Sequence, residues 1–137
     1  MRYVLDSSVA FKTLVAEQDS DKAIRLLDDF RNGVVELIAP DVLPIEVAHA
    51  LTRAERQIRI TPTEGYALWS LMMADCPQLS PSLSLMTQAY MISSQERLGI
   101  YDCLYIALAE QEGCSMMTDD ARLAAVFPKR VILLATL

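Results

Sequence analysis

The feature that most constrains the fold is a regular alternation of short apolar runs with segments of helical period. The short runs are typical of buried strands and occupy residues 2–6, 34–40, 114–118 and 130–135. Between them, helical patterns occupy residues 19–33, 42–58, 61–72, 83–98, 101–110 and 119–127. Strands that alternate with helices predict a parallel sheet covered on both faces. We therefore expect an α/β fold.

Several residues mark where the helices begin and end. Asp19 or Ser20 can cap the helix that finishes near Gly33, and "TPTE" at 61–64 is a capping box with proline in the first turn. Glycines at 99 and 113 are expected to end the two helices that precede them.

Composition limits the class of protein. A chain of 137 residues without a linker or repeat predicts a single domain over 1–137. No apolar run approaches the length of a membrane span, and the N-terminus lacks the layout of a signal peptide, so we expect no membrane association and a cytoplasmic location. One histidine and three scattered cysteines do not make a zinc site. The net charge of −6 usually argues against nucleic-acid binding.

Acidic residues follow the predicted strands or open the predicted helices. Asp6 closes the first strand, Glu46 lies early in the helix after the second, Asp102 begins the helix "YDCLYIALAE", and Asp119 and Asp120 follow "CSMMT". The carboxyl ends of parallel strands meet at one edge of the sheet, so these acids are expected to share one crevice. Glu46 stands out because it lies among apolar residues, where an unpaired acid is costly.

Clustered carboxylates raise one another's pKa unless a cation balances them. Oxygen ligands without histidine or cysteine favour Mg²⁺ or Mn²⁺ over Zn²⁺. Four carboxylates balance two such ions, and a two-metal site suits in-line phosphoryl displacement by metal-activated water.

Simpler interpretations remain open for each acid. Asp6, Asp102 and Asp120 can each serve as a helix cap or interact with a helix dipole. A receiver-like signalling module also carries acids at strand ends, but here serines follow Asp6, and Lys129 comes after Pro128. The serine-hydrolase and nucleotide-binding glycine motifs are absent.

Four segments together resemble the PIN-domain ribonucleases of the VapC-like toxin type. They are "VLDSSVAFK", "APDVLPIEVAHAL", "IYDCLYIALAE" and "MMTDDARL", in the order and at the separations of that family, and they cover nearly the whole chain. The resemblance implies a PIN-like three-layer α/β/α sandwich with a central, mainly parallel sheet. It also implies Mg²⁺- or Mn²⁺-dependent cleavage of RNA, a homodimer and inhibition by a cognate antitoxin protein. A PIN fold that has lost activity and serves as an RNA- or protein-binding scaffold is the alternative.

By this resemblance, the catalytic and metal-binding acids are Asp6, Glu46, Asp102 and Asp120. Asp120 is the match because the fourth motif reads Thr-x-Asp from Thr118, which leaves Asp119 as an additional candidate. Ser7 or Ser8 would supply the hydroxyl that positions a metal ligand or a phosphate.

Basic residues near these motifs are candidates for substrate binding. Lys12 either approaches the scissile phosphate or lies on a helix surface. Arg53, Arg56 and Arg59 recur every three residues and either line a groove for the RNA backbone, form a solvated face or meet an acidic antitoxin segment. Tyr101 and Tyr105 are interpreted as packing residues.

Overall fold

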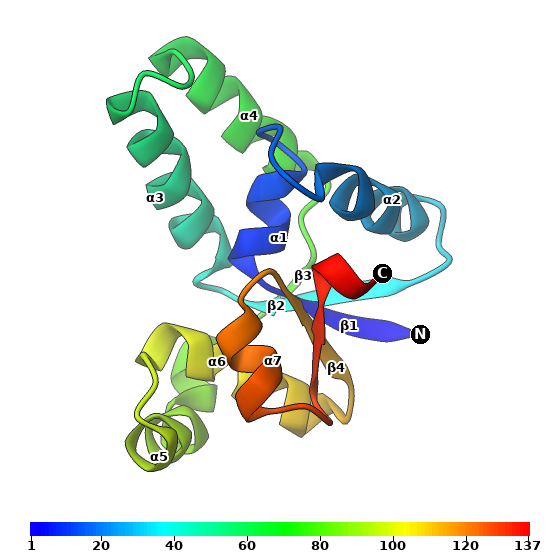
Figure 1. Ribbon diagram of the computed structural model, residues 1–137, viewed down its shortest axis with the longest axis vertical. Coiled ribbons are helices and arrows are strands. Elements are labelled where there is room, and N and C mark those ends of the chain that lie inside the picture. The colour runs from blue at the N-terminus through cyan, green and yellow to red at the C-terminus, as the bar shows by residue number, and fades with distance from the viewer.

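The central layer of the molecule is a five-stranded sheet in which all neighbouring strands are parallel (Figure 1). The structure is a computed structural model that describes residues 1–137. The strand order is β3-β2-β1-β4-β5. The strands are β1 (Arg2–Leu5), β2 (Glu36–Pro40), β3 (Gln78–Ser80), β4 (Ser115–Thr118) and β5 (Val131–Leu133). The expected sheet is confirmed, and the receiver-like alternative is wrong because such folds have the order 2-1-3-4-5.

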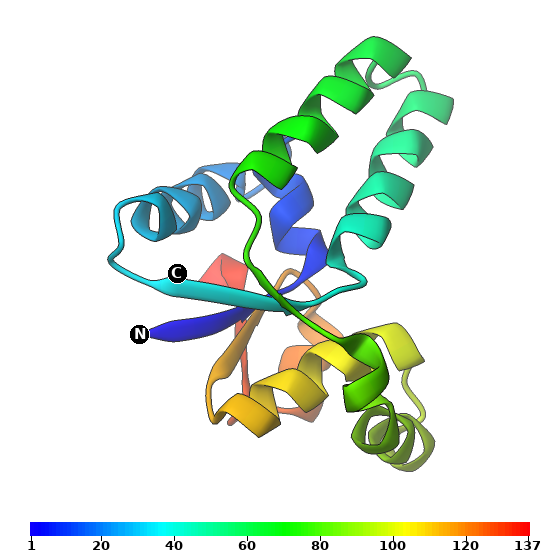
Figure 2. The same cartoon turned by 180° about the vertical axis from the view of Figure 1, so that it is seen from behind.

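Helices cover both faces of this sheet. Those above it in Figure 1 are α1 (Ser7–Lys12), α2 (Ser20–Arg31), α3 (Leu43–Arg56) and α4 (Pro62–Ala74). Those below it are α5 (Met86–Glu96), α6 (Ile100–Glu112) and α7 (Ala121–Val126). Helices α3 and α4 form a hairpin that projects away from the sheet, as the reverse view in Figure 2 also shows. The predicted three-layer α/β/α arrangement is therefore confirmed.

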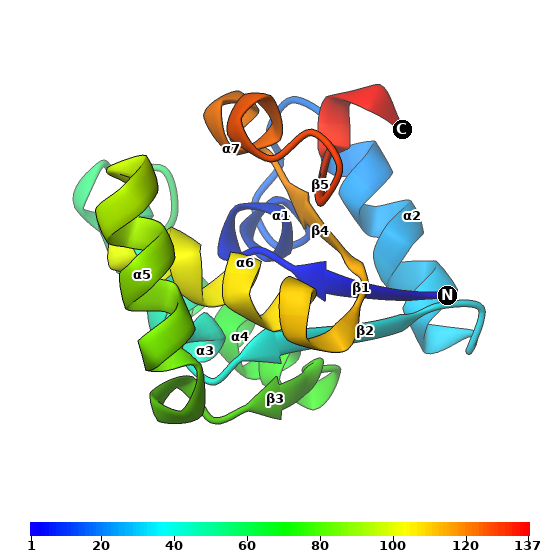
Figure 3. The ribbon, with the colours of Figure 1, turned by 90° about the horizontal axis from the view of Figure 1, so that it is seen from below.

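Helix α6 is the most buried helix. Residues 103–109 are all buried, because the helix lies across β1, β2 and β4 on one side and packs against α5 on the other (Figure 3). Their apolar character all round the helix follows from this position. The α6 residues join one core cluster of 29 buried side chains that continues through the sheet to α1, α2 and α3. No helix is both long and apolar enough to cross a membrane.

The sequence patterns place most elements correctly and miss two short ones. Strand β3 has three residues and α1 has six, too few to show a period. The helix expected over 83–98 is a 3₁₀ turn (Ser82–Leu85) followed by α5, which ends at Arg97 with φ of 57°. Gly99 is instead the N-cap of α6. The last strand is shorter than expected, because a 3₁₀ turn begins at Leu134.

The parallel topology brings four distant segments to one edge of the sheet. The chain leaves β1 into α1, leaves β2 towards α3, and leaves β4 towards α7, all at the left edge of the sheet in Figure 1. Helix α6 also begins at this edge. The predicted acids all lie on these segments.

Candidate active site

Asp6 is the buried centre of the acidic edge. Its side chain follows β1 and only 5% of the residue is exposed. The Ser8 and Thr118 hydroxyls donate to its Oδ2 at 2.6 and 2.7 Å. Asp6 occupies the N-cap position of α1, but its side chain makes no capping hydrogen bond, so capping does not account for its main contacts.

The same two hydroxyls also fix the loop that follows β4. Ser8 Oγ accepts from the backbone N–H of Asp119, and Thr118 Oγ1 accepts from that of Asp120, both at 3.1 Å. Thr118 is fully buried. Ser8 and Thr118 therefore hold Asp6 and the β4–α7 loop together. Ser7 also lies beside the site, but its hydroxyl donates no hydrogen bond to Asp6.

Glu46 lies in the first turn of α3 and is held by a residue that the sequence patterns assign to packing. The Tyr105 hydroxyl donates to Glu46 Oε1 at 2.6 Å, and Tyr105 is fully buried in α6. Tyr105 comes three residues after Asp102, so both lie on the same side of α6. That spacing is the signal by which the sequence could have revealed it.

Asp102 and Asp120 complete the acidic set. Asp102 lies in the first turn of α6, is partly buried and has no side-chain hydrogen bond; Gly99, and not Asp102, is the N-cap. Asp120 is the N-cap of α7, and its Oδ1 accepts from the backbone N–H of Arg122 at 2.9 Å. The Arg122 guanidinium also forms an ion pair with Asp120.

The pKa values of Glu46 and Asp102 are raised by burial and also by the charges of neighbouring acids of this set. Burial is the main cause of the raised pKa of Asp6. Burial and then the charges of Asp6 and Asp102 raise the pKa of Glu46, although its bond from Tyr105 opposes this. Burial and the charges of Asp6 and Asp120 raise the pKa of Asp102. The Arg122 hydrogen bond lowers the pKa of Asp120. The four predicted acids therefore lie close enough to repel one another.

These side chains do not form a closed metal cage by themselves. No three His, Cys, Asp or Glu side chains are grouped tightly enough to hold a metal ion. Local partners hold three of the acids: hydroxyls bind Asp6, Tyr105 binds Glu46, and Arg122 binds Asp120. The donor chemistry nevertheless fits a hard divalent cation, because every group is a carboxylate oxygen and their mutual repulsion calls for a positive charge.

Comparison with known proteins identifies the family. The model of the PIN domain matches residues 3–127. This chain belongs to the PIN domain family. This chain is 27% identical to Ribonuclease VapC3 of Pyrobaculum aerophilum over 135 residues, which cover 96% of this chain and 98% of that protein.

Two solved structures share the fold of this PIN domain. The first is VapBC2 from Rickettsia felis bound to a DNA fragment from their promoter, with a TM-score of 0.64, 12% identity and 97% of both chains covered. The second is FitAcB from Neisseria gonorrhoeae, with a TM-score of 0.67, 15% identity and 100% of both chains covered.

Asp119, the additional candidate, forms an ion pair with a lysine of the PIN domain. Its carboxylate pairs with the Lys12 ammonium at 3.3 Å. Lys12 is buried, donates to the backbone carbonyl of Gln18 at 2.7 Å and also pairs with Glu17 at 3.5 Å. The helix-surface interpretation of Lys12 is therefore wrong.

A polar groove of about 410 Å³ lies between α1 and α3; none of the four acids lines it, but Ser7 and Ser8, which follow Asp6, do. Lys12, His49, Arg53, Arg59 and Asp119 are among its lining residues. Arg59 is already paired with Glu17 at 2.9 Å and lies over the Phe11 ring. Arg53 has no ion pair, and Arg56 is exposed but does not line the groove. The structure thus separates Arg53 from Arg56, which the sequence pattern treats alike.

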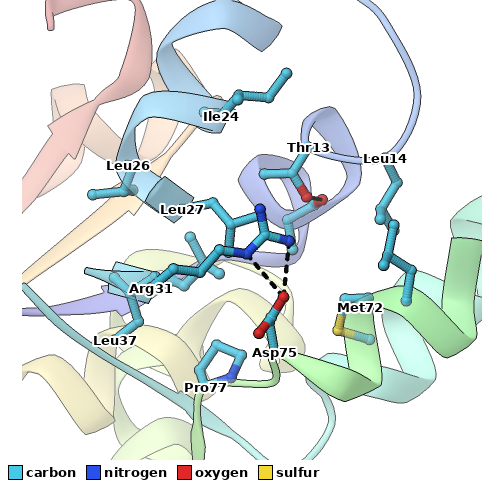
Figure 4. Close-up of a pocket in the computed structure, with 14 residues that line it drawn as sticks. Thr13, Leu14, Ile24, Leu26, Leu27, Arg31, Leu37, Met72, Asp75 and Pro77 are labelled. Carbon is cyan, nitrogen blue, oxygen red and sulfur yellow. Dashed lines mark hydrogen bonds and ion pairs between the residues drawn. The ribbon is translucent and has the colours of Figure 1, made fainter. Parts of the chain in front are cut away.

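A second cavity in the PIN domain is apolar. It has a volume of about 210 Å³ and lies among α1, α2, β2 and the end of α4 (Figure 4). The Arg31 guanidinium and the Asp75 carboxylate form an ion pair beside it at 2.8 Å. None of the four acids lines it, so it is separate from the acidic site.

Proposed function

We propose that this PIN domain is a divalent-metal-dependent endoribonuclease that acts as the toxin of a toxin–antitoxin pair. The observation that carries the proposal is the meeting of Asp6, Glu46, Asp102 and Asp120 at one edge of the sheet, where three of them have raised pKa values. The similarity to a protein named a ribonuclease supports RNA as the substrate.

In this proposal, each acid has its own task. Asp6, Asp102 and Asp120 hold Mg²⁺ or Mn²⁺, and Glu46 either binds the cation through water or orients the nucleophile. The bound cation supplies activation of water and neutralisation of charge on the phosphodiester. Ser8 and Thr118 keep Asp6 in place through the hydrogen bonds described above. Tyr105 keeps Glu46 in place in the same way.

The cleavage assay tests the proposal directly. The purified protein is incubated with total cellular RNA in Mg²⁺, in Mn²⁺ and in a chelator, and the cut sites are mapped. We expect cleavage only with metal, and none by Asp102→Asn, whose fold is checked by circular dichroism. Wild-type protein that binds RNA but never cuts it would identify the scaffold alternative. Equal cleavage by Asp102→Asn and wild type would refute the assignment of the site.

We further propose that the groove between α1 and α3 binds the RNA backbone through Arg53, because Lys12 is buried and already bonded to Gln18, Glu17 and Asp119. Arg53 lines the groove and Arg56 does not, so they form a matched pair on one helix. Arg53→Gln should weaken RNA affinity about tenfold and reduce its salt dependence by about one ion, whereas Arg56→Gln should change neither. Equal effects of the two substitutions would argue for a solvated face instead.

The toxin assignment includes two protein partners, a cognate antitoxin and a second copy of the chain. The fold shared with VapBC2 supports the first. Co-expression with a small protein encoded next to this gene should suppress RNA cleavage and yield a complex on gel filtration. The mass of the isolated protein, measured by light scattering, tests the homodimer.

A further inference from the structure

Arg122 has a place at the acidic site that the proposed function leaves unexplained. Its Nη2 donates to Asp120 Oδ2 at 2.8 Å, and its Nε donates to Asp120 Oδ1 at 3.3 Å. The backbone N–H of Arg122 donates to the same Oδ1 at 2.9 Å. Arg122 therefore contacts both oxygens of a carboxylate that is expected to bind metal.

Arg122 is also the only basic side chain that forms a salt bridge with any of the four acids. Every other ion pair in the molecule involves a different acid, and Lys12 pairs with Asp119 and Glu17. The Arg122 charge also affects a second acid of the site, because it opposes the rise in the pKa of Asp102 that burial and the neighbouring acids cause. In the absence of metal, Arg122 is the counter-charge at this edge of the sheet.

The ion pair can open without disturbing the fold. The Arg122 side chain is 72% exposed, and an ion pair so accessible to water is weak. Asp120 does not depend on the guanidinium for its position, because its backbone N–H donates to the buried Thr118 hydroxyl. Asp120 also keeps its bond from the Arg122 backbone N–H when the side chain moves.

We propose that Arg122 exchanges ligands during the reaction: it leaves Asp120 when a divalent cation binds there and then binds a phosphate of the RNA. This inference rests on the proposed function. A dication and a guanidinium repel each other, so both cannot hold the same carboxylate edge. The planar guanidinium of the freed side chain matches the oxygens of a phosphate, which makes two parallel hydrogen bonds with it.

The exchange also addresses a problem of charge at the site. Four carboxylates repel an incoming polyanion, and a cation that is released only after metal binding appears next to the substrate at the moment it is needed. Arg122 thus links metal loading to RNA binding. The two halves of this exchange predict opposite effects of removing the same side chain.

The first measurement is metal affinity without RNA. Isothermal titration calorimetry with Mn²⁺ compares wild type with Arg122→Met, which keeps the helix-forming stem and the backbone N–H. We expect the variant to bind Mn²⁺ about two- to fivefold more tightly, because the competing guanidinium is gone. Arg25→Met is the control, because it removes the same charge. Arg25 is a similarly exposed arginine that pairs with Asp21 on α2. Unchanged or weaker binding by Arg122→Met, relative to this control, would overturn the competition.

The second measurement is RNA cleavage at saturating Mn²⁺. Arg122→Met should raise the KM for RNA about tenfold with a much smaller change in kcat, and should lower the salt dependence of KM by about one ion. Arg122→Lys should recover part of the lost affinity, since it keeps the charge without the two-pronged contact. A KM equal to that of wild type would overturn the phosphate contact. If wild type cuts no RNA, the proposed function and the phosphate contact both fail, whereas calorimetry still decides the competition for Asp120.

Discussion

At the scale of single residues, the site is a set of acids that the fold keeps in unfavourable surroundings. Asp6 is buried without a cation beside it, and only two hydroxyls and the nearby backbone N–H groups offset the loss of water. The sequence identifies this acid and its three companions, because each follows a strand or opens a helix. The spacing from Asp102 places Tyr105 on the same side of α6, but it does not reveal the bond to Glu46, which lies 59 positions away on another helix.

Asp6→Asn should therefore stabilise the metal-free protein while it abolishes cleavage. The amide still accepts from Ser8 or Thr118 but carries no charge to be buried, so the free energy of unfolding at pH 7 should rise by about 1 kcal/mol. Urea unfolding with a chelator present measures this. In saturating Mg²⁺, wild type should instead be more stable than Asp6→Asn, because the metal stabilises only the protein that binds it. A variant less stable than wild type in chelator would contradict the argument.

Tyr105→Phe tests whether the buried hydroxyl orients Glu46. The ring stays and only the donor to Glu46 is lost, so the fold should persist while Mn²⁺ affinity falls about tenfold, as for other residues that orient metal ligands. Calorimetry measures the affinity. Tyr90→Phe on α5 is the matched control, because Tyr90 is 68% exposed and should have no effect. Equal affinities in wild type and Tyr105→Phe would leave Tyr105 a packing residue only.

At the scale of elements, the α3–α4 hairpin shows what local patterns can and cannot predict. The capping box at Thr61 and Glu64 is read from four letters and is present with both hydrogen bonds. The turn before it is not predictable in this way. Ile58 adopts φ of 58°, a left-handed conformation that a β-branched residue rarely takes, and 91% of it is exposed. No burial of the side chain offsets this conformation.

Ile58→Asn should stabilise the protein by about 1 kcal/mol, because asparagine tolerates the left-handed region and almost no apolar contact is lost. Thermal unfolding monitored by circular dichroism measures the gain. Leu83→Asn provides the comparison, since Leu83 is 88% exposed but has no positive φ, and we expect no gain there. A lower melting temperature for Ile58→Asn would show that Ile58 makes contacts the exposed fraction does not reveal.

At the scale of the whole molecule, the sheet topology explains both what the sequence predicts and what it cannot. The alternation of strands and helices fixes the parallel sheet, and a parallel sheet gathers the acids at one edge. The distances within that edge depend on side-chain partners from different segments, such as Lys12 with Asp119 and Arg122 with Asp120. No periodicity encodes those pairings, so the expected closed cluster of carboxylates is not what the fold presents by itself.

The coupled acids predict an unusual pH dependence of stability. The pKa values of Asp6, Glu46 and Asp102 are raised in the folded protein, so the folded state keeps these protons at pH values where the unfolded chain has lost them. The contribution of these three groups to the free energy of unfolding should therefore fall as the pH rises from about 4, the ordinary range of carboxyl groups, through the raised values, while Asp120, whose pKa is lowered, contributes in the opposite direction.

The contribution of Asp102 can be isolated by comparing Asp102→Asn with wild type. Urea unfolding of both proteins is measured in chelator, from about pH 4 upwards. The variant should gain stability relative to wild type as the pH rises, and the difference should disappear at low pH, where Asp102 is protonated in both states. A difference that stays constant with pH would mean that neither burial nor the neighbouring charges raise the pKa of Asp102.

The two hydroxyls that hold Asp6 are synthesised far apart in time, one early and one late in translation. Ser8 is made almost with Asp6, but Thr118 follows 112 residues later. During synthesis, the ribosome must release β4 before the second hydroxyl reaches β1. If the protein is a toxin that cuts RNA, its nascent chain is harmless to the messenger that encodes it until translation of the site is complete.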